Sequence, residues 1–233
     1  MASYQLPYHQ LIAGALKQFN ADFLIEHTIC FGGGTRIALE LDEYRESVDI
    51  DFLCPNIAAY RAVREQITTA SLGSLVQQEF EYLREIRADR YAVRTFLKLE
   101  HTVVKLEIVS CDEYRLTAGF DKTIFPVPYL SPESCWITKL LANADRALAP
   151  PFKDVFDLVA MHVAWGAIPQ AAWGEAERHY GIVPHRELLK ALEAMLAKPE
   201  FYLARAADMK MKPDWAKRIV YQGADELYQS VKS

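Results

Sequence analysis

The chain has 233 residues, enough for one large domain or two small ones, with 51% hydrophobic and 24% charged residues. This composition is ordinary for a globular protein and excludes collagen-like, disordered and disulfide-scaffold classes. The formal net charge of -5 excludes a uniformly basic nucleic-acid-binding coat, although it leaves room for a local basic patch.

Membrane insertion and secretion are not expected from this sequence. No apolar run is long enough to cross a bilayer, and the first residues lack the basic and apolar regions of a signal peptide. We therefore expect a cytoplasmic protein without membrane association. The cysteines form no Cys-x-x-Cys pair and are predicted to be buried free thiols: Cys30, Cys54, Cys111 and Cys135.

Helical and strand-like patterns alternate in the first half of the chain. Apolar residues at helical spacing predict one helix over about residues 7–26, and residues 57–83 look mainly helical. A β-prone run at 28–31 stops at three glycines, and a brief helix is expected over about 35–42. Alternating patterns predict strands over 47–53, 91–99 and 102–110.

The second half of the chain shows one helical pattern after another. Ser131-Pro132-Glu133 has the form of an N-cap followed by proline at the first helical position, and this helix should end near Ala149. Further helices are expected over about 152–165, 184–198, 199–211 and 213–232. Strand pairs with flanking helices, followed by a helical block, predict an α+β fold.

The most informative stretch is Phe31-Gly32-Gly33-Gly34-Thr35, followed by Asp49-Ile50-Asp51. A glycine turn between a strand and a helix presents backbone N–H groups to phosphate oxygens at close range. Two carboxylates at i and i+2 of a strand share one face and repel each other unless a cation lies between them. Mg²⁺ is commonly held by such carboxylates together with substrate phosphates. The pattern favours a metal-bound triphosphate; the alternative is a glycine hairpin followed by an edge strand with two solvated acids.

A third acid is expected on a neighbouring strand. Glu107 is the lone acid of an apolar run and needs a partner, because an unpaired acid there is costly. One interpretation is a metal site shared with Asp49 and Asp51, in which the three carboxylates together bind two metal ions. The alternative is an ion pair with a neighbouring cation, Lys105 or Arg94.

These motifs resemble the family of AbiEii-like toxin nucleotidyltransferases, within the DNA polymerase β-like nucleotidyltransferase superfamily. The superfamily pattern is a hydrophobic-Gly-Gly/Ser turn, about a dozen residues and then Asp-x-Asp/Glu; the gap here is at or slightly above the upper end. The approach Arg45-x-Ser47 to the acids is more specific to AbiEii-like members. The resemblance covers residues 28 to about 160, and the helical remainder more weakly.

The resemblance implies a polymerase β-like nucleotidyltransferase domain with a mixed sheet over residues 1–130. A helical domain over residues 131–233 is then expected to complete the nucleotide cleft. The family's catalytic metal ligands match Asp49, Asp51 and Glu107, with Mg²⁺ or Mn²⁺ as the ion. In this comparison Glu107 also assists deprotonation of the acceptor hydroxyl.

Nucleotide contacts are implied at two further places. The phosphate-binding turn matches Gly33, Gly34 and Thr35. The family also carries a lysine on the first C-terminal helix, which Lys139 fits, and a later Lys-Asp-x-x-Asp segment, which Lys153-Asp154-x-x-Asp157 fits. The resemblance thus adds Lys139 and Asp154 to the catalytic residues and assigns nucleotide contacts to Lys139, Arg146 and Lys153.

The activity implied is metal-dependent transfer of a nucleoside monophosphate from an NTP to an acceptor hydroxyl, releasing pyrophosphate. The resemblance implies that the acceptor is a tRNA 3′ end or another RNA. It also implies that the protein is the toxin of a toxin–antitoxin or phage-defence pair, with a cognate antitoxin as partner. A second interpretation is a small-molecule (antibiotic-like) nucleotidyltransferase, which the acidic balance favours slightly. A third is a non-catalytic nucleotide-binding module, which the intact acid pair disfavours.

Two stretches of the sequence are locally basic. The denser one contains Arg84, Arg87, Arg90, Arg94 and Lys98, and the other contains Lys210, Lys212, Lys217 and Arg218. Each has two interpretations, a surface for RNA phosphates or a solvated face paired with nearby acids.

Overall fold

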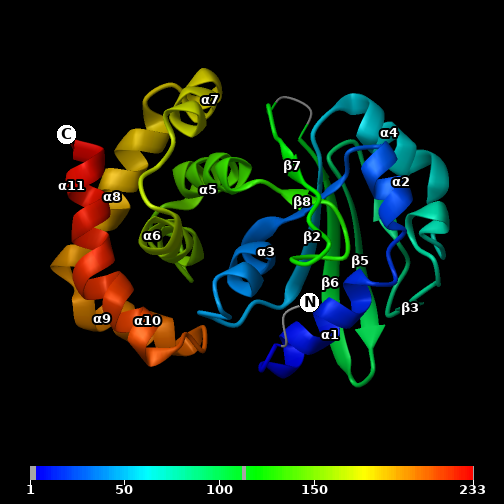
Figure 1. Cartoon of the computed structure of the whole chain (residues 1–233), viewed down its shortest axis with the longest axis horizontal. Coiled ribbons are helices and arrows are strands. Elements are labelled where there is room, and N and C mark those ends of the chain that lie inside the picture. Colours follow the sequence, from blue (N-terminus) through cyan, green and yellow to red (C-terminus); the bar gives the residue numbers. More distant parts are fainter. Residues whose placement is uncertain (1–3, 112–113, 233) are drawn as a thin grey trace. The chain divides into compact units, whose positions relative to one another are not determined.

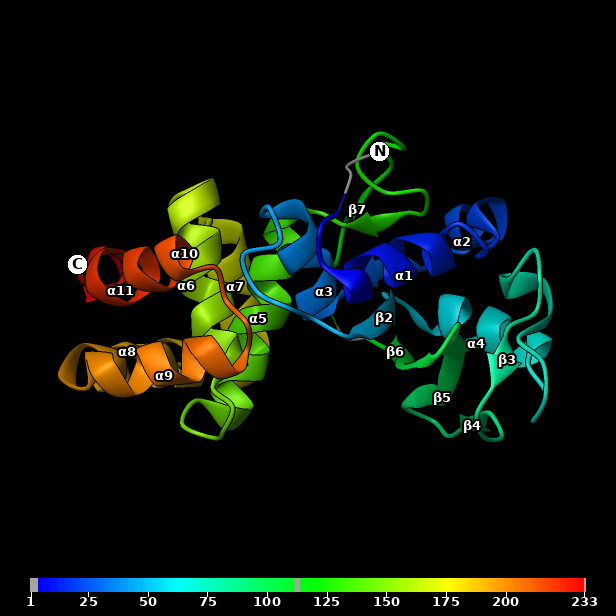
Figure 2. The ribbon, with the colours of Figure 1, turned by 90° about the horizontal axis from the view of Figure 1, so that it is seen from below.

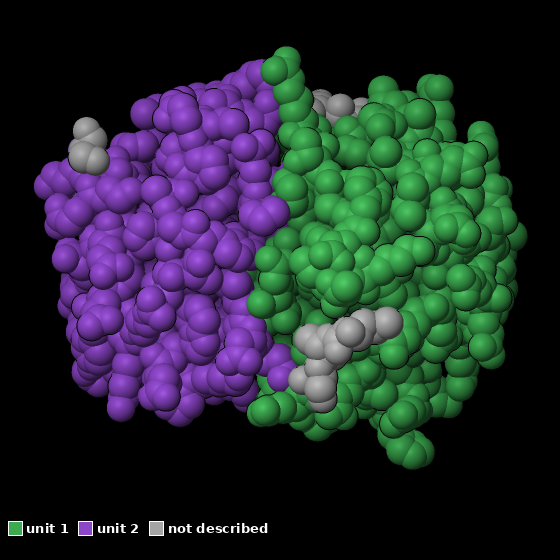
Figure 3. All heavy atoms as spheres, viewed as in Figure 1, with its two compact units in different colours: residues 1–40, 47–131 green, residues 41–46, 132–233 purple. Residues whose placement is uncertain are grey.

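The computed structural model describes residues 4–111 and 114–232, which divide into two compact units (Figure 3). Unit 1 comprises residues 1–40 and 47–131, and unit 2 comprises residues 41–46 and 132–233. The predicted α+β fold is confirmed, with a mixed sheet in unit 1 and helices in unit 2. Within the described ranges, no helix combines the length and apolarity needed to span a membrane.

The sheet of unit 1 places the acid-bearing strand in its interior. Its strands are β1 (Cys30–Gly32), β2 (Asp49–Cys54), β3 (Glu81–Tyr82), β4 (Arg87–Ala88), β5 (Ala92–Leu99), β6 (Thr102–Ser110), β7 (Ala118–Gly119) and β8 (Tyr129–Leu130). They run in the order β3-β5-β6-β2-β1-β8-β7, with β4 paired to β5. Figure 1 labels β2, β3 and β5 to β8. Strand β2 is parallel to β6 and antiparallel to β1, so the edge-strand alternative is wrong.

One face of this sheet is covered by helices. Helices α1 (Pro7–Leu16), α2 (Ala21–Glu26) and α4 (Ile57–Gln66) contribute to a core with the sheet, and Figure 2 shows α1 and α2 on one side of it. Ile50 and Phe52 of β2 are fully buried in this core. Because side chains alternate along a strand, Asp49 and Asp51 project from the opposite face, which we call the open face.

Two helical predictions in unit 1 are too long. The segment 7–26 is two helices, because Asn20 caps α2 by accepting a hydrogen bond from the N–H of Phe23. The segment 57–83 is helical only as far as Gln66, followed by a short 3-10 turn (Gly73–Leu75) and β3. Gly73 has a φ of +56° there, and a Cβ on it would meet the Gln66 carbonyl, so the chain turns instead of continuing a helix.

Unit 2 consists of helices together with the short segment 41–46. The helices are α5 (Pro132–Arg146), α6 (Lys153–Trp165), α7 (Gln170–Tyr180), α8 (Val183–Ala197), α9 (Pro199–Asp208), α10 (Pro213–Arg218) and α11 (Ala224–Lys232), with a π-helical turn at Ile219–Gly223. Helix α5 contacts α6, α7 and α8. Helix α7, which begins directly after Pro169, is not among the helices expected from the sequence. The cysteines are buried and free, as predicted.

Candidate active site

The glycine turn after β1 opens helix α3 (Gly33–Glu40). Gly33 has a φ of +69°, and a Cβ built on it would lie 2.1 Å from Oδ2 of Asp51. Both the positive φ and this close approach require glycine. The Asp51 carboxylate therefore lies against backbone at the start of α3, where the first N–H groups of a helix have no intrahelical acceptors.

A buried hydrogen-bond chain fastens α3 to β2. The hydroxyl of Thr35 lies 2.5 Å from the carbonyl oxygen of Asp49 and 2.8 Å from Oγ of Ser47, and the Ser47 N–H donates to Nε2 of His9 at 3.0 Å. The hydroxyl of Thr35 thus forms its hydrogen bonds within the protein, and they hold Asp49 beside the glycine turn. His9 carries no sequence signal for this role, because the contact depends on the tertiary fold.

Glu107 lies beside Asp51 on the open face. The parallel pairing of β2 with β6 aligns Asp51 with Glu107 and Asp49 with Lys105. Both carboxylate oxygens of Glu107 accept hydrogen bonds, one from Nε of Arg94 at 2.8 Å and one from Nζ of Lys105 at 2.6 Å. Partial burial would raise the pKa of Glu107, but these two cations outweigh burial and hold it below its usual value. The ion-pair alternative for Glu107 is therefore present in the structure.

The donor set at this place suits a magnesium site with two protein carboxylates. In the described parts of the chain, no group of three or more His, Cys, Asp or Glu side chains is arranged to hold a metal ion. Asp49 and Asp51 nevertheless project from one strand face, both partly exposed, beside the turn that only glycine can form. Mg²⁺ is usually bound through one or two carboxylates plus substrate phosphates, so these residues fit the ion.

The lysine and aspartates predicted downstream form a buried ion network inside unit 2. Nζ of Lys139 on α5 lies 3.0 Å from Oδ1 of Asp154 and 2.5 Å from Oδ2 of Asp157, both on α6. Arg45 contacts Asp157 through two nitrogens at 2.7 and 3.0 Å, and the Tyr44 hydroxyl donates a hydrogen bond to the same carboxylate. The network joins the segment 41–46 to both helices.

The charges of this network stabilise one another. Burial alone would raise the pKa of Asp157, but Arg45 and Lys139 hold it well below its usual range. Burial alone would lower the pKa of Lys139, and Asp157 and Asp154 together raise it above its usual value. Both acids and both bases are therefore ionised at neutral pH, which is the state in which a buried network is satisfied.

The remaining predicted residues of unit 2 lie at the edge of this network. Arg146 is mostly exposed and donates to both oxygens of Asp154, at 2.6 and 3.2 Å. Lys153 is partly exposed at the first position of α6. In the second basic stretch, Lys210 pairs with Glu46 and Lys212 with Asp42, which matches the interpretation of that stretch as a paired face.

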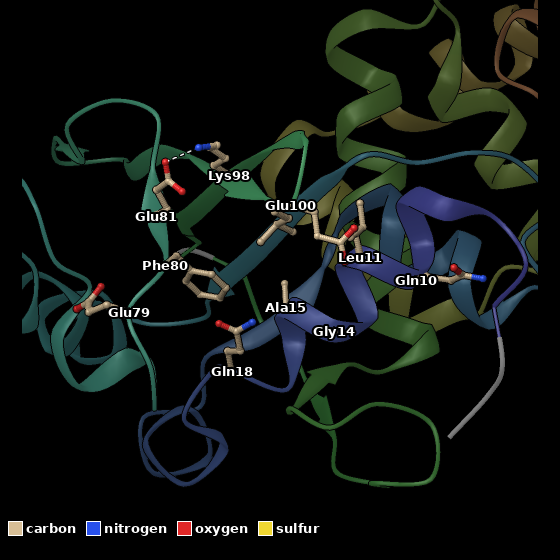
Figure 4. A pocket seen from close by; sticks show the side chains of 11 residues that line it. Gln10, Leu11, Gly14, Ala15, Gln18, Glu79, Phe80, Glu81, Lys98 and Glu100 are labelled. Carbon is tan, nitrogen blue, oxygen red and sulfur yellow. Dashed lines mark hydrogen bonds and ion pairs between the residues drawn. The ribbon is translucent and has the colours of Figure 1, made fainter.

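A separate pocket of about 310 Å³ lies in unit 1 (Figure 4). It is lined by α1 and by residues of β3 and β5, among them Gln10, Gln18, Glu81 and Lys98, of which the last two form an ion pair of 2.6 Å. None of the predicted catalytic, nucleotide-binding or metal-binding residues lines this pocket, so it is distinct from the candidate active site.

Known structures share this fold. A Helicobacter pylori protein assigned to the nucleotidyltransferases superposes with a TM-score of 0.55 at 14% identity, covering 100% of this chain and 98% of that chain. JHP933 from Helicobacter pylori superposes with a TM-score of 0.51 at 16% identity, covering 99% and 95%. No curated protein matches the sequence.

The family comparison assigns the chain to the nucleotidyltransferases. The model of the family described as nucleotidyl transferase AbiEii toxin, type IV toxin–antitoxin system, matches residues 15–227. The chain belongs to this family, as the resemblance seen in its motifs predicts.

Proposed function

We propose that unit 1 carries the metal-dependent transfer of a nucleoside monophosphate from an NTP to an acceptor hydroxyl. The acceptor oxygen attacks the α-phosphorus, the bond from that phosphorus to the bridging oxygen breaks, and pyrophosphate leaves with the electron pair. The hydroxyl proton passes to solvent. The observation that carries the proposal is the contact between Asp51 and Gly33, which brings a carboxylate to a helix start suited to phosphate.

In this proposal Asp49 and Asp51 hold Mg²⁺ or Mn²⁺. The ion, when bound, neutralises triphosphate charge and polarises the phosphoryl group. Backbone N–H groups at Gly33, Gly34 and Thr35 bind phosphate oxygens, which needs no side chain there. The hydroxyl of Thr35 keeps β2 and its acids at the correct distance from this turn.

Glu107 is proposed as the third acid of the site, as a metal ligand and not as the base that accepts the hydroxyl proton. Its low pKa keeps it ionised, which suits a metal ligand and makes it a poor proton acceptor. It holds Arg94 and Lys105 beside the aspartates, and it joins the metal only by giving up one of these ion pairs. For the residues of unit 2, the nucleotide contacts of Lys139, Arg146 and Lys153 and the catalytic part of Asp154 stay predictions.

The acceptor proposed is an RNA, with the 3′ end of tRNA as the first choice. Family membership and the cations next to the acids on the open face support this choice. The type IV toxin–antitoxin family supports a cognate antitoxin as partner. The reaction is proposed to take place in the cytoplasm, where NTPs and RNA are both present.

The test is an assay with each common NTP labelled at the α-phosphate, Mg²⁺ or Mn²⁺, and either total RNA or an aminoglycoside panel. Label in RNA of tRNA size is the expected result, and the NTP that labels it is the substrate. Label in an aminoglycoside would reassign the acceptor to a small molecule. No pyrophosphate release with any NTP, acceptor or metal would overturn the proposed activity.

A further inference from the structure

Strand pairing aligns charged side chains across the open face of unit 1. Asp51 of β2, Glu107 of β6 and Arg94 of β5 are successive register partners, and Arg87 of β4 is the partner of Arg94. Partners in register point to the same face of a sheet. A row of side chains therefore leads from the proposed catalytic acid to two arginines.

The neighbouring row adds an aromatic ring to this face. Asp49, Lys105 and Phe96 are register partners across β2, β6 and β5. The guanidinium of Arg84 lies over the Phe96 ring, 4.1 Å from its centroid. Lys98 follows Phe96 by two residues and so projects from the same face. We call Arg84, Arg87, Arg94, Lys98 and Lys105 the basic face.

The cations of the basic face are open to solvent. The side chains of Arg94, Lys98 and Lys105 are 45%, 44% and 38% exposed, and Arg84 and Arg87 are exposed as well. The acids that contact it are Glu81 on Lys98, Asp89 on Arg94, and Glu107 on Arg94 and Lys105. Among the described residues these three acids pair with three of the five cations, and exposed ion pairs of this kind are weak enough to exchange for phosphate.

We propose that the basic face is the docking surface for a single-stranded RNA acceptor; this inference rests on the proposed function. Its cations contact successive phosphates, and a base stacks on the Arg84 guanidinium, which Phe96 supports from below. The rows then direct the RNA's terminal hydroxyl across β5 and β6 toward Asp49 and Asp51 on β2. A sheet face on which an arginine plane stacks on an aromatic ring suits unstacked bases, whereas a protein partner of acidic character needs no stacking platform.

The test compares two triple variants with equal loss of charge. One is Arg84→Ala, Arg87→Ala and Lys98→Ala, and the control is Lys17→Ala, Arg61→Ala and Lys122→Ala, which are exposed cations elsewhere in unit 1. Binding of a fluorescent single-stranded RNA with a 3′-deoxy end, which cannot accept a nucleotide, is measured by anisotropy from about 50 to 200 mM salt.

We expect the basic-face variant to bind about tenfold more weakly and its plot of log affinity against log salt to flatten by about 2, at about 0.7 for each phosphate that is no longer neutralised. The control variant should bind as the wild type does, and NTP binding should be unchanged in both. Equal weakening in the two variants, an unchanged salt slope, or no binding by the wild type would overturn the docking surface.

The same experiment separates this inference from the proposed activity. If the wild type binds the RNA through the basic face but transfers no nucleotide to a reactive RNA, the proposed activity fails and the docking surface stands. If transfer to RNA occurs and the basic-face variant transfers as well as the control, only the docking surface fails. If an acidic peptide displaces the RNA from the basic face, the surface binds a protein of acidic character, and the inference is overturned.

Discussion

Two pairs of closely spaced aspartates lie in opposite environments. Asp154 and Asp157 of unit 2 are buried on a helix, where cations from other segments neutralise them. Asp49 and Asp51 of unit 1 are partly exposed on a strand, beside a backbone turn that only glycine can form. Carboxylates whose charge is neutralised inside the protein stabilise the fold, while a pair beside a helix start is suited to a ligand.

Of the substitutions that test this difference, Asp157→Ala is expected to have the largest effect, on the free energy of unfolding. Removing this carboxylate leaves Arg45 and Lys139 buried with too little negative charge, which costs about 3–5 kcal/mol. Urea or thermal unfolding measures the loss. Adding Arg45→Met should restore part of the stability, because a buried charge is then removed. A loss under about 1 kcal/mol would mean that the network does not stabilise unit 2.

The next largest effect is on catalysis, from Gly33→Ala. The new methyl group would overlap Oδ2 of Asp51, and a displacement of about 1 Å at a reacting site lowers the rate about 100-fold. Gly181→Ala is the matched control, since Gly181 also has a positive φ, of +55°, but no atom lies within 4 Å of a Cβ there. Nucleotide transfer measured for both should fall only in the first variant. Equal transfer by the two would separate Gly33 from the chemistry.

Acid should destabilise the protein through the buried pair. The pKa of Asp154 is low because Lys139 and Arg146 outweigh its burial, and the pKa of Asp157 is low because Arg45 and Lys139 outweigh its burial. A carboxyl with a depressed folded-state pKa stabilises fully above its unfolded pKa of about 3.9, and this contribution is lost as pH falls through the folded value. Melting temperature measured from neutral to acid pH should fall steeply below about pH 4.

Asp154→Asn is the variant that checks this interpretation. It should melt lower than the wild type at neutral pH and show a shallower decline in acid, because it has one fewer carboxyl to protonate. Parallel curves for the two proteins would assign the acid sensitivity to other groups.

The smallest effect is expected from an exposed ion pair of the same unit. The Asp42 side chain is 81% exposed and contacts Nζ of Lys212 at 2.9 Å. Asp42→Asn should change the free energy of unfolding by less than about 1 kcal/mol, because solvent screens the pair and asparagine tolerates the positive φ of +56° at this position. A loss comparable to that of Asp157→Ala would show that burial is not what separates strong from weak pairs here.

The sequence predicts the longer strands of unit 1 and most helices of unit 2, but it misses the two-residue strands β3, β4, β7 and β8 and joins separate segments of unit 1 into overlong helices. Strands β2, β5 and β6 follow from alternation, because one face of each is buried in a single core. The helix expected over 57–83 fails after Gln66, where Gly73 and the residues around it form a turn that apolar spacing does not reveal. Helical periodicity alone therefore overestimates segments that contain a turn.

The site divides in the same way. The glycine turn and the two aspartates are visible as a local motif, and the apolar run around Glu107 predicts that this acid needs either a metal or a cation. That Glu107 pairs with Arg94 and Lys105 depends on the register of β5, β6 and β2, which local sequence does not determine. Arg45 and Asp157 lie 112 residues apart, so their ion pair follows only from the folded structure.

The most direct measurement determines nucleotide transfer and melting temperature together for Asp51→Asn, a change that keeps the side chain's size and removes its charge. We expect transfer to fall about 100-fold or more, from loss of several kcal/mol of transition-state stabilisation, with the melting temperature close to that of the wild type. Transfer at the wild-type rate by the folded Asp51→Asn protein would contradict the assignment of the chemistry to the glycine–aspartate site.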